Sequence, residues 1–180
     1  AAPQRWQVRF WSRAGKLLAY MITFWGIEVN RDQIKAVECL KLLGNPKEVQ
    51  VLTGMLAALN RFISKFANWC RPFYQLLKKW KGFQWNKQCE KPFQDLKDYL
   101  VWAPMLLASK PSEDLFMYLL VFEHAESAVL LRDQSVQQPI YYVSKTLVDV
   151  ETRYLPLEKL VLALVHATRK LPHYFQAHTI

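Results

Sequence analysis

The 180-residue sequence has few cysteines, few glycines and no long apolar run. Its three cysteines, Cys39, Cys70 and Cys89, form no C-x-x-C pair, which argues against a zinc site or a disulfide framework and favours buried free thiols in a reducing compartment. No run approaches the roughly 18 apolar residues that cross a bilayer, so we expect no membrane partner. The start, AAPQRWQVRFW, lacks the apolar core of a secretory signal. We therefore expect an intracellular protein, in either the cytoplasm or the nucleus.

What the sequence does contain indicates a folded protein with a charged half. Hydrophobic residues make up 52% and aromatic residues 14%, which excludes a disordered tail. Residues 1–90 hold 15 Lys or Arg against 5 Asp or Glu, a net charge of +10, whereas residues 91–180 hold 9 against 10, a net charge of −1. This asymmetry favours an anionic partner for the first half, with nucleic acid the obvious candidate. A solvated basic surface is the alternative.

The first thirty residues indicate a small antiparallel sheet. Gln7–Trp11 and Lys16–Thr23 alternate loosely between apolar and polar side chains. Ala14 and Gly15 are expected to form the turn between them, and Gly26–Val29 to form a short third strand.

Four helices are expected next, and three of them have clear start signals. Asn30 is a natural N-cap for the first. Asn45, followed by Pro46 and Glu48, predicts the start of the second by a capping box with proline at its first position. The third carries Trp69 and Phe73 and ends in lysines, and the fourth follows a cap at residue 86.

In the second half of the sequence, the spacing of apolar residues changes from a helical period to that of strands. Strands are expected at about 115–122, 127–132 and 139–144, followed by a long helix from about 154 to 171. The change of period and of charge places a domain boundary near Gly82, which gives domains of residues 1–81 and 82–180. The predicted fold class is α+β.

Residues 139–178 resemble the ribonuclease H region of gypsy-class retrotransposon polyproteins, in which a strand of the form P-I-x-Y-x-S-(K/R)-x-L precedes a helix start E-x-x-Y-x-x-x-E-K. Four further segments are similar to the same family in the same order: GKLLAYMITFWGIEVNRDQIKAV, VQVLTGMLAALNRFISKFANWCRPFYQLLKK, FQWNKQCEKPFQDLKDYL and FMYLLVFEHAESAVLLRDQ. The resemblance implies the end of a reverse-transcriptase palm hairpin, a helical thumb or connection unit, and a C-terminally incomplete ribonuclease H-like mixed sheet with a long helix. The wording of LAALNRFIS, VSKTL, ETRY and YFQAH is most similar to plant elements of the Tat lineage.

Active relatives in this family cut RNA with two Mg²⁺ ions, which need several converging carboxylates. The resemblance places Glu123 where the first-strand Asp stands and Leu160 where the helix Glu stands. Glu158 lies about 200° around the helix from that position, and His124 and Glu126 have no ligand spacing. The third acid of the ribonuclease reaction and the paired aspartates of the polymerase reaction are expected outside residues 1–180. We therefore expect no intact catalytic site, no metal site and no resident cofactor, with residual ribonuclease H activity through Glu123 as the alternative.

The expected role is instead to contact the backbone of an RNA–DNA hybrid or another nucleic acid, beside the remaining polyprotein modules. The family's template–primer-facing helices correspond to a stretch whose cations are Arg61, Lys65, Arg71, Lys78, Lys79 and Lys81. Trp69, Trp80 and Trp85 lie among them and could stack on bases, although core packing is the expected fate of at least two. A vestigial fragment without molecular activity is the other alternative.

Overall fold

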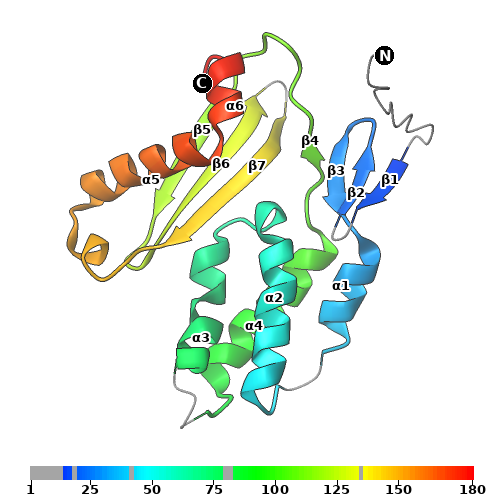
Figure 1. Ribbon diagram of the computed structural model, residues 1–180, viewed down its shortest axis with the longest axis vertical. Coiled ribbons are helices and arrows are strands. Elements are labelled where there is room, and N and C mark those ends of the chain that lie inside the picture. Colours follow the sequence, from blue (N-terminus) through cyan, green and yellow to red (C-terminus); the bar gives the residue numbers. More distant parts are fainter. Residues whose placement is uncertain (1–13, 18–19, 41–42, 79–82, 134–135) are drawn as a thin grey trace, which may run out of the picture.

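The computed structural model describes residues 14–17, 20–40, 43–78, 83–133 and 136–180, and it confirms the α+β class. Two units are visible in Figure 1, a helical unit with a small sheet and a second unit in which helices cover a larger sheet. Each unit has its own cluster of buried apolar side chains. Among the described residues, no helix has the length and apolar character that a bilayer crossing requires.

The small sheet has four described strands in the order in which they follow along the chain, all antiparallel. They are β1 (Ala14–Leu17), β2 (Tyr20–Thr23), β3 (Gly26–Val29) and β4 (Leu106–Leu107). The turn expected at Ala14 and Gly15 is wrong, because both residues lie in β1, opposite Thr23 and Ile22. The expected single strand from residue 16 to residue 23 is two strands, and the expected strand Gln7–Trp11 lies outside the described residues.

Residue 26 must be glycine for the small sheet to close. A Cβ atom built on Gly26 would overlap the backbone carbonyl of Leu106, which pairs with the neighbouring residue of β3. The pairing of β3 with β4 therefore ties residues 106–107, which follow the helices in the chain, back to the strands that precede them.

The helices begin where their caps predict. The side-chain oxygens of Asn30, Asn45 and Asn86 each accept a hydrogen bond of 3.0 Å from a first-turn backbone N–H. The helical elements are α1 (Arg31–Glu38), α2 (Pro46–Ala58), the short 3₁₀ helix η1 (Asn60–Phe62), α3 (Phe66–Lys78) and α4 (Lys87–Val101).

The core of the first unit joins the four α-helices. Fully buried Leu52 and Leu56 of α2, Phe73 of α3, and Leu96 and Leu100 of α4 belong to one cluster. By packing, α4 therefore lies with the helices that precede it. The predicted boundary residue, number 82, is outside the described residues, and the domain division stays a prediction.

The second unit is a three-stranded sheet with helices on one face (Figure 1). Its elements are β5 (Phe116–Val121), β6 (Ala125–Asp133), β7 (Gln137–Thr146), the 3₁₀ helix η3 (Glu151–Arg153), α5 (Pro156–Lys170) and α6 (Pro172–Ala177). These agree with the expected strands and long helix, although the three described strands are antiparallel where a mixed sheet was expected. Pro172 starts α6 and so separates it from α5.

β5 is the edge strand of this sheet and exposes an apolar stripe. Phe116, Tyr118 and Leu120 are each between 41% and 49% exposed, and β6 is the partner of β5 within the described sheet. Just before β5, the backbone N–H of Leu115 donates to the carbonyl oxygen of Thr179 at 2.9 Å. The last residues of the chain therefore lie beside the start of β5.

Two of the three cysteines match the expectation of buried free thiols. Cys70 and Cys89 are buried and unpaired, and burial raises the pKa of the Cys70 thiol to about 12. Cys39 is exposed, so the expectation is wrong for that residue. Its neighbours at the end of α1 leave it on the surface because Val37 occupies the buried position of that helix.

The two units meet across β7, whose side chains alternate between them. Tyr141 and Val143 face the core under α5, whereas Tyr142 packs against the helical core. Ser144 is next on the helical side, and its Oγ donates to the Glu126 carbonyl (2.9 Å) and accepts from the Ala67 backbone N–H (3.0 Å). Ala67 is in the first turn of α3, where N–H groups lack helical partners, so β7 caps α3 from outside.

A buried ion pair fixes the segment that connects the units. The Arg132 guanidinium of β6 donates to both carboxylate oxygens of Glu113, at 2.7 and 2.9 Å, and to the Ala108 carbonyl at 3.0 Å. Its hydrogen bonds hold the pKa of Glu113 below its usual range. The chain between β4 and β5 is thereby fastened to the sheet that it leads into.

Ser144→Ala should weaken the junction between the units. The Ala67 N–H would lose its acceptor, and a buried unsatisfied donor costs about 1–3 kcal/mol of unfolding free energy. Urea denaturation measures the loss, with Thr146→Ala, an exposed position on the same strand, as the matched control. Equal stability of the two variants would contradict this role for Ser144.

Candidate functional site

The first-strand acid position lies on the surface. Glu123 follows β5, and its side chain is 82% exposed, with Oε1 3.2 Å from Nε2 of His124. Its backbone carbonyl accepts a hydrogen bond of 3.1 Å from the Lys159 ammonium of α5. Residue 123 is thus attached to α5 through its backbone, while its carboxylate is directed to solvent.

The helix that should supply a second acid supplies none at the corresponding position. Leu160 is half-buried in the first turns of α5 and has no oxygen to offer. Glu158 accepts a hydrogen bond of 2.8 Å from the Leu155 backbone N–H and so caps the helix. Across the part of the chain that the structure describes, no three His, Cys, Asp or Glu side chains are grouped to hold a metal ion. These residues do not fit the oxygen cage that a pair of Mg²⁺ ions requires.

The predicted phosphate contacts divide into two kinds. Arg61, in η1, is half-buried, and its guanidinium carbon lies 5.2 Å from the ring centres of both Tyr20 and Tyr141. Lys65 is exposed, in a left-handed conformation with φ of 57°, and its ammonium lies 5.9 Å from the Phe122 ring centre. Arg61 therefore joins β2 to β7, whereas Lys65 remains open to solvent.

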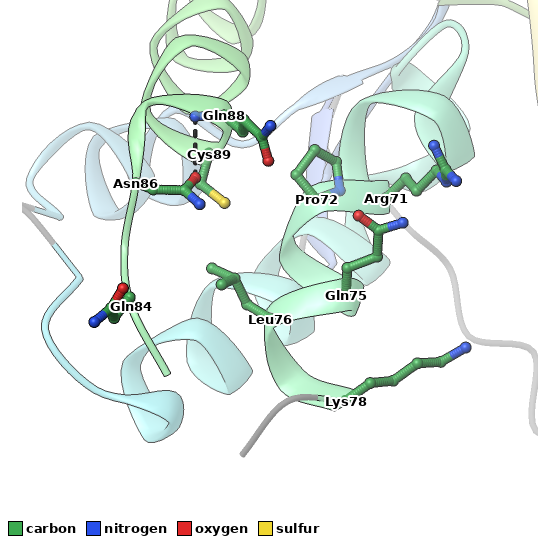
Figure 2. Close-up of a pocket in the computed structure, with 9 residues that line it drawn as sticks. All are labelled: Arg71, Pro72, Gln75, Leu76, Lys78, Gln84, Asn86, Gln88 and Cys89. Atoms are coloured by element: carbon green, nitrogen blue, oxygen red, sulfur yellow. Dashed lines mark hydrogen bonds between the residues drawn. The ribbon is translucent and has the colours of Figure 1, made fainter. Parts of the chain in front are cut away.

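Arg71 and Lys78 lie seven residues apart on α3 and line one groove between α3 and the start of α4 (Figure 2). The groove has a volume of about 670 Å³, and amide side chains, among them Gln75 and Gln88, line it as well. No Asp or Glu occurs in the sequence between Glu48 and Glu90, so the groove is basic. Lys79 and Lys81 lie outside the described residues.

Two of the three tryptophans expected near the basic side chains pack against the core. Trp69 packs edge-to-face on Tyr99, with ring centres 5.3 Å apart, and Trp85 stacks on Phe73 at 6.0 Å. Both rings pack against the helical core, which confirms the expectation for two of the three. Trp80 lies outside the described residues.

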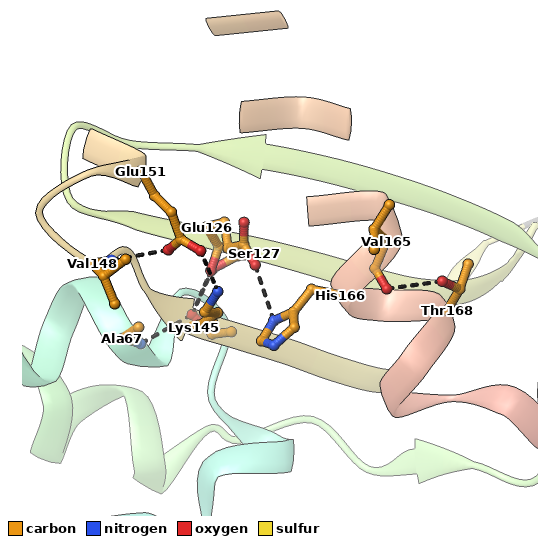
Figure 3. Close-up of polar contacts among 10 residues, drawn as sticks. Ala67, Glu126, Ser127, Lys145, Val148, Glu151, Val165, His166 and Thr168 are labelled. Atoms are coloured by element: carbon orange, nitrogen blue, oxygen red, sulfur yellow. Dashed lines mark hydrogen bonds and ion pairs between the residues drawn. The ribbon is translucent and has the colours of Figure 1, made fainter. Parts of the chain in front are cut away.

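Sequence reasoning missed a polar cluster under α5, drawn in Figure 3. Glu126 of β6 is 2% exposed, and its Oε1 lies 3.0 Å from Nδ1 of His166 on α5. The signal that could have located it is the period of β6, because residue 126 shares a sheet face with the buried Ala128 and Leu130. Its spacing from His124, by contrast, carried no information.

Sequence comparisons identify relatives among retroelements. A family model described as "RNase H-like domain found in reverse transcriptase" matches residues 85–180. The Retrovirus-related Pol polyprotein from transposon 297 of Drosophila melanogaster is 27% identical over 166 residues, 92% of this chain and 15% of that protein. The Transposon Tf2-3 polyprotein of Schizosaccharomyces pombe is 25% identical over 164 residues, 90% of this chain and 12% of that protein. The chain spans only a small part of the length of these relatives.

Solved structures show the same fold. The foamy viral protease-reverse transcriptase in complex with RNA/DNA hybrid matches with a TM-score of 0.75 at 21% identity, over 88% of this chain and 22% of that chain. The same enzyme in a dRH form with double-stranded DNA matches with a TM-score of 0.74 at 21% identity, over 87% and 28%. At this identity the likeness establishes the arrangement of elements.

Arg61→Lys should lower stability because a lysine keeps the charge but not the flat guanidinium that packs between two rings. We expect a loss of about 1 kcal/mol in unfolding free energy, measured by chemical denaturation. Arg31→Lys, an exposed position at the start of α1, is the control. Unchanged stability together with weaker nucleic-acid binding would assign Arg61 to phosphate contact instead.

Proposed function

Because the chain belongs to the family of RNase H-like domains found in reverse transcriptase, within retrotransposon polyproteins, we propose that it binds the backbone of a nucleic-acid duplex and cuts no RNA by itself. The observation that supports binding is the basic character of α3 and its flanks, a stretch without Asp or Glu between residues 48 and 90 in which Lys65, Arg71 and Lys78 are accessible. Lys79 and Lys81 belong to the same proposed set. Arg61 lies behind this surface and stabilises it by packing its guanidinium on the rings of Tyr20 and Tyr141.

The chemistry of these side chains favours phosphate over base recognition. Lysine ammonium groups are compact point charges, and the arginine fork matches two phosphate oxygens. Contacts of this kind position a duplex without reading its sequence. The structural neighbours named above are complexes with RNA/DNA hybrid and with double-stranded DNA, which supports the same partner class for this chain. The other modules of a polyprotein are the proposed protein partners.

We propose the absence of ribonuclease activity from the side chains available to bind metal ions. Hydrolysis by paired ions needs oxygen donors that converge on both metals. Leu160 provides a hydrocarbon at one required position, and the exposed Glu123 carboxylate belongs to no group of three His, Cys, Asp or Glu side chains that could hold a metal ion among the described residues. Mg²⁺ is the cofactor of active relatives, and we assign none to this chain.

The assignment to the gypsy class and to a plant Tat-like lineage is proposed from the similarity of short sequence segments. The segments LAALNRFIS at 56–64, VSKTL at 143–147 and YFQAH at 174–178 are its basis. In that lineage a first ribonuclease H-like module serves as a connection beside a second one. The proposed role of this chain is the same, a connection that holds a duplex.

Binding should fall with salt in proportion to the phosphates contacted. Each contact contributes about 0.9 to the log–log slope, so Arg71→Gln combined with Lys78→Gln should make the slope shallower by about 2. Fluorescence anisotropy on a labelled RNA–DNA hybrid over a sodium chloride series measures this. Lys110→Gln with Arg153→Gln, two exposed cations outside the proposed surface, is the matched control. A flat salt dependence in the unaltered protein would exclude the proposal.

No cleavage of a labelled RNA–DNA hybrid is expected with Mg²⁺ or Mn²⁺, because the donor set is incomplete. Leu160→Glu should not confer cleavage, since one added carboxylate beside Glu123 still leaves the ions under-coordinated. Product analysis on denaturing gels is the measurement. Cleavage by the unaltered protein that disappears in Glu123→Gln would show an active site.

A further inference from the structure

Glu126 is a buried carboxylate with no oriented hydrogen bond. Its residue is 2% exposed, and neither side-chain oxygen has a hydrogen-bond partner among the described residues. Nδ1 of His166 also lacks one, although it approaches Glu126 Oε1 to 3.0 Å (Figure 3). Buried polar atoms left unpaired are rare in folded proteins and call for an explanation. Here the two unpaired groups face each other.

The charges around the pair do not neutralise Glu126 directly. They come from three elements and are Lys145 on β7, Glu151 in η3, and Arg169 and Lys170 on α5. Lys145 is opposite Glu126 in the β6–β7 register, yet its ammonium is 2.9 Å from Glu151 Oε1. Glu151 also accepts from the Val148 backbone N–H at 2.9 Å. Lys145 is therefore engaged by another carboxylate, and Glu126 has His166 as its close polar neighbour.

Burial acts on the two groups in opposite directions. Desolvation raises the pKa of Glu126 and lowers the pKa of His166, so each is driven towards its neutral form. With one titrating proton between them the pair carries no net charge, and either a carboxyl O–H can donate to the ring nitrogen or a ring N–H can donate to the carboxylate. The His166 side chain is 32% exposed, which gives this proton access to solvent.

We propose that Glu126 and His166 form a buried proton-binding site that fastens α5 to β6 while the pair holds one titrating proton. Loss of that proton leaves a buried anion, and gain of a second leaves a buried cation. Both states cost desolvation energy at the contact between helix and sheet. The pair is independent of the proposed nucleic-acid surface, since none of its residues belongs to that surface.

The direction of the pH effect follows from the two shifts. For Glu126 the pKa is raised on folding, so its contribution to stability is present below the ordinary carboxyl pKa and is lost as pH rises through the raised value. For His166 the pKa is lowered on folding, so its contribution is present above the ordinary imidazole pKa and is lost as pH falls through the lowered value. Docking of α5 therefore weakens on both the acid and the alkaline side.

Nuclear magnetic resonance of the imidazole nitrogens tests whether the proton is shared. In the unaltered protein the His166 signals should shift in two separate pH intervals, because the pair loses two protons in macroscopic steps. Glu126→Gln should leave one interval. A single titration with the same midpoint in both proteins would overturn the proposal.

Chemical denaturation across pH provides a second readout that needs no assignment of signals. Glu126→Gln should remove the alkaline loss of stability, seen as a smaller rise in the unfolding equilibrium constant as the pH increases above the ordinary carboxyl pKa. His166→Gln should remove the acid loss instead. Glu123→Gln, an exposed carboxylate three positions away, is the matched control and should change neither side. If stability depends on pH in the same way in Glu126→Gln, His166→Gln and this control, the proposal is also overturned.

Discussion

The structure depends on β7, a strand that must satisfy two cores at once. Its alternating side chains place Tyr141 and Tyr142 on opposite faces, one under α5 and the other against the helices. Ser144 completes the junction by accepting from the first turn of α3 while donating to the backbone of β6. The helix that carries the basic groove therefore has its N-terminus fixed on the RNase H-like sheet, and a duplex held by that helix would be oriented relative to the sheet.

Local signals predicted the fold where local interactions decide it. The asparagine caps located three helices because a cap acts within a few residues of its own position. The division of the expected strand into β1 and β2 escaped prediction because the recognisable turn signal was Gly15, and that residue lies inside β1. β4 escaped for another reason. Two residues between prolines become a strand only through pairing with β3, which depends on tertiary structure.

The candidate site was predictable as a list of residues but not as an arrangement. The sequence placed Leu160 in a helix and Glu123 at a strand end, and both lie there. It could not distinguish Arg61, which packs between two tyrosines from distant parts of the chain, from the exposed Lys65. The depth of Glu126 was equally hidden, because it depends on which face of β6 the α5 helix covers.

The free edge of β5 has a consequence for the protein in concentrated solution. One side of this strand presents backbone donors and acceptors without a strand neighbour in the described sheet, next to a row of half-exposed apolar side chains. Such an edge is a template on which an extended segment of another molecule can align. Strand addition at β5 would join two molecules through backbone hydrogen bonds and would leave the described helices of both in place.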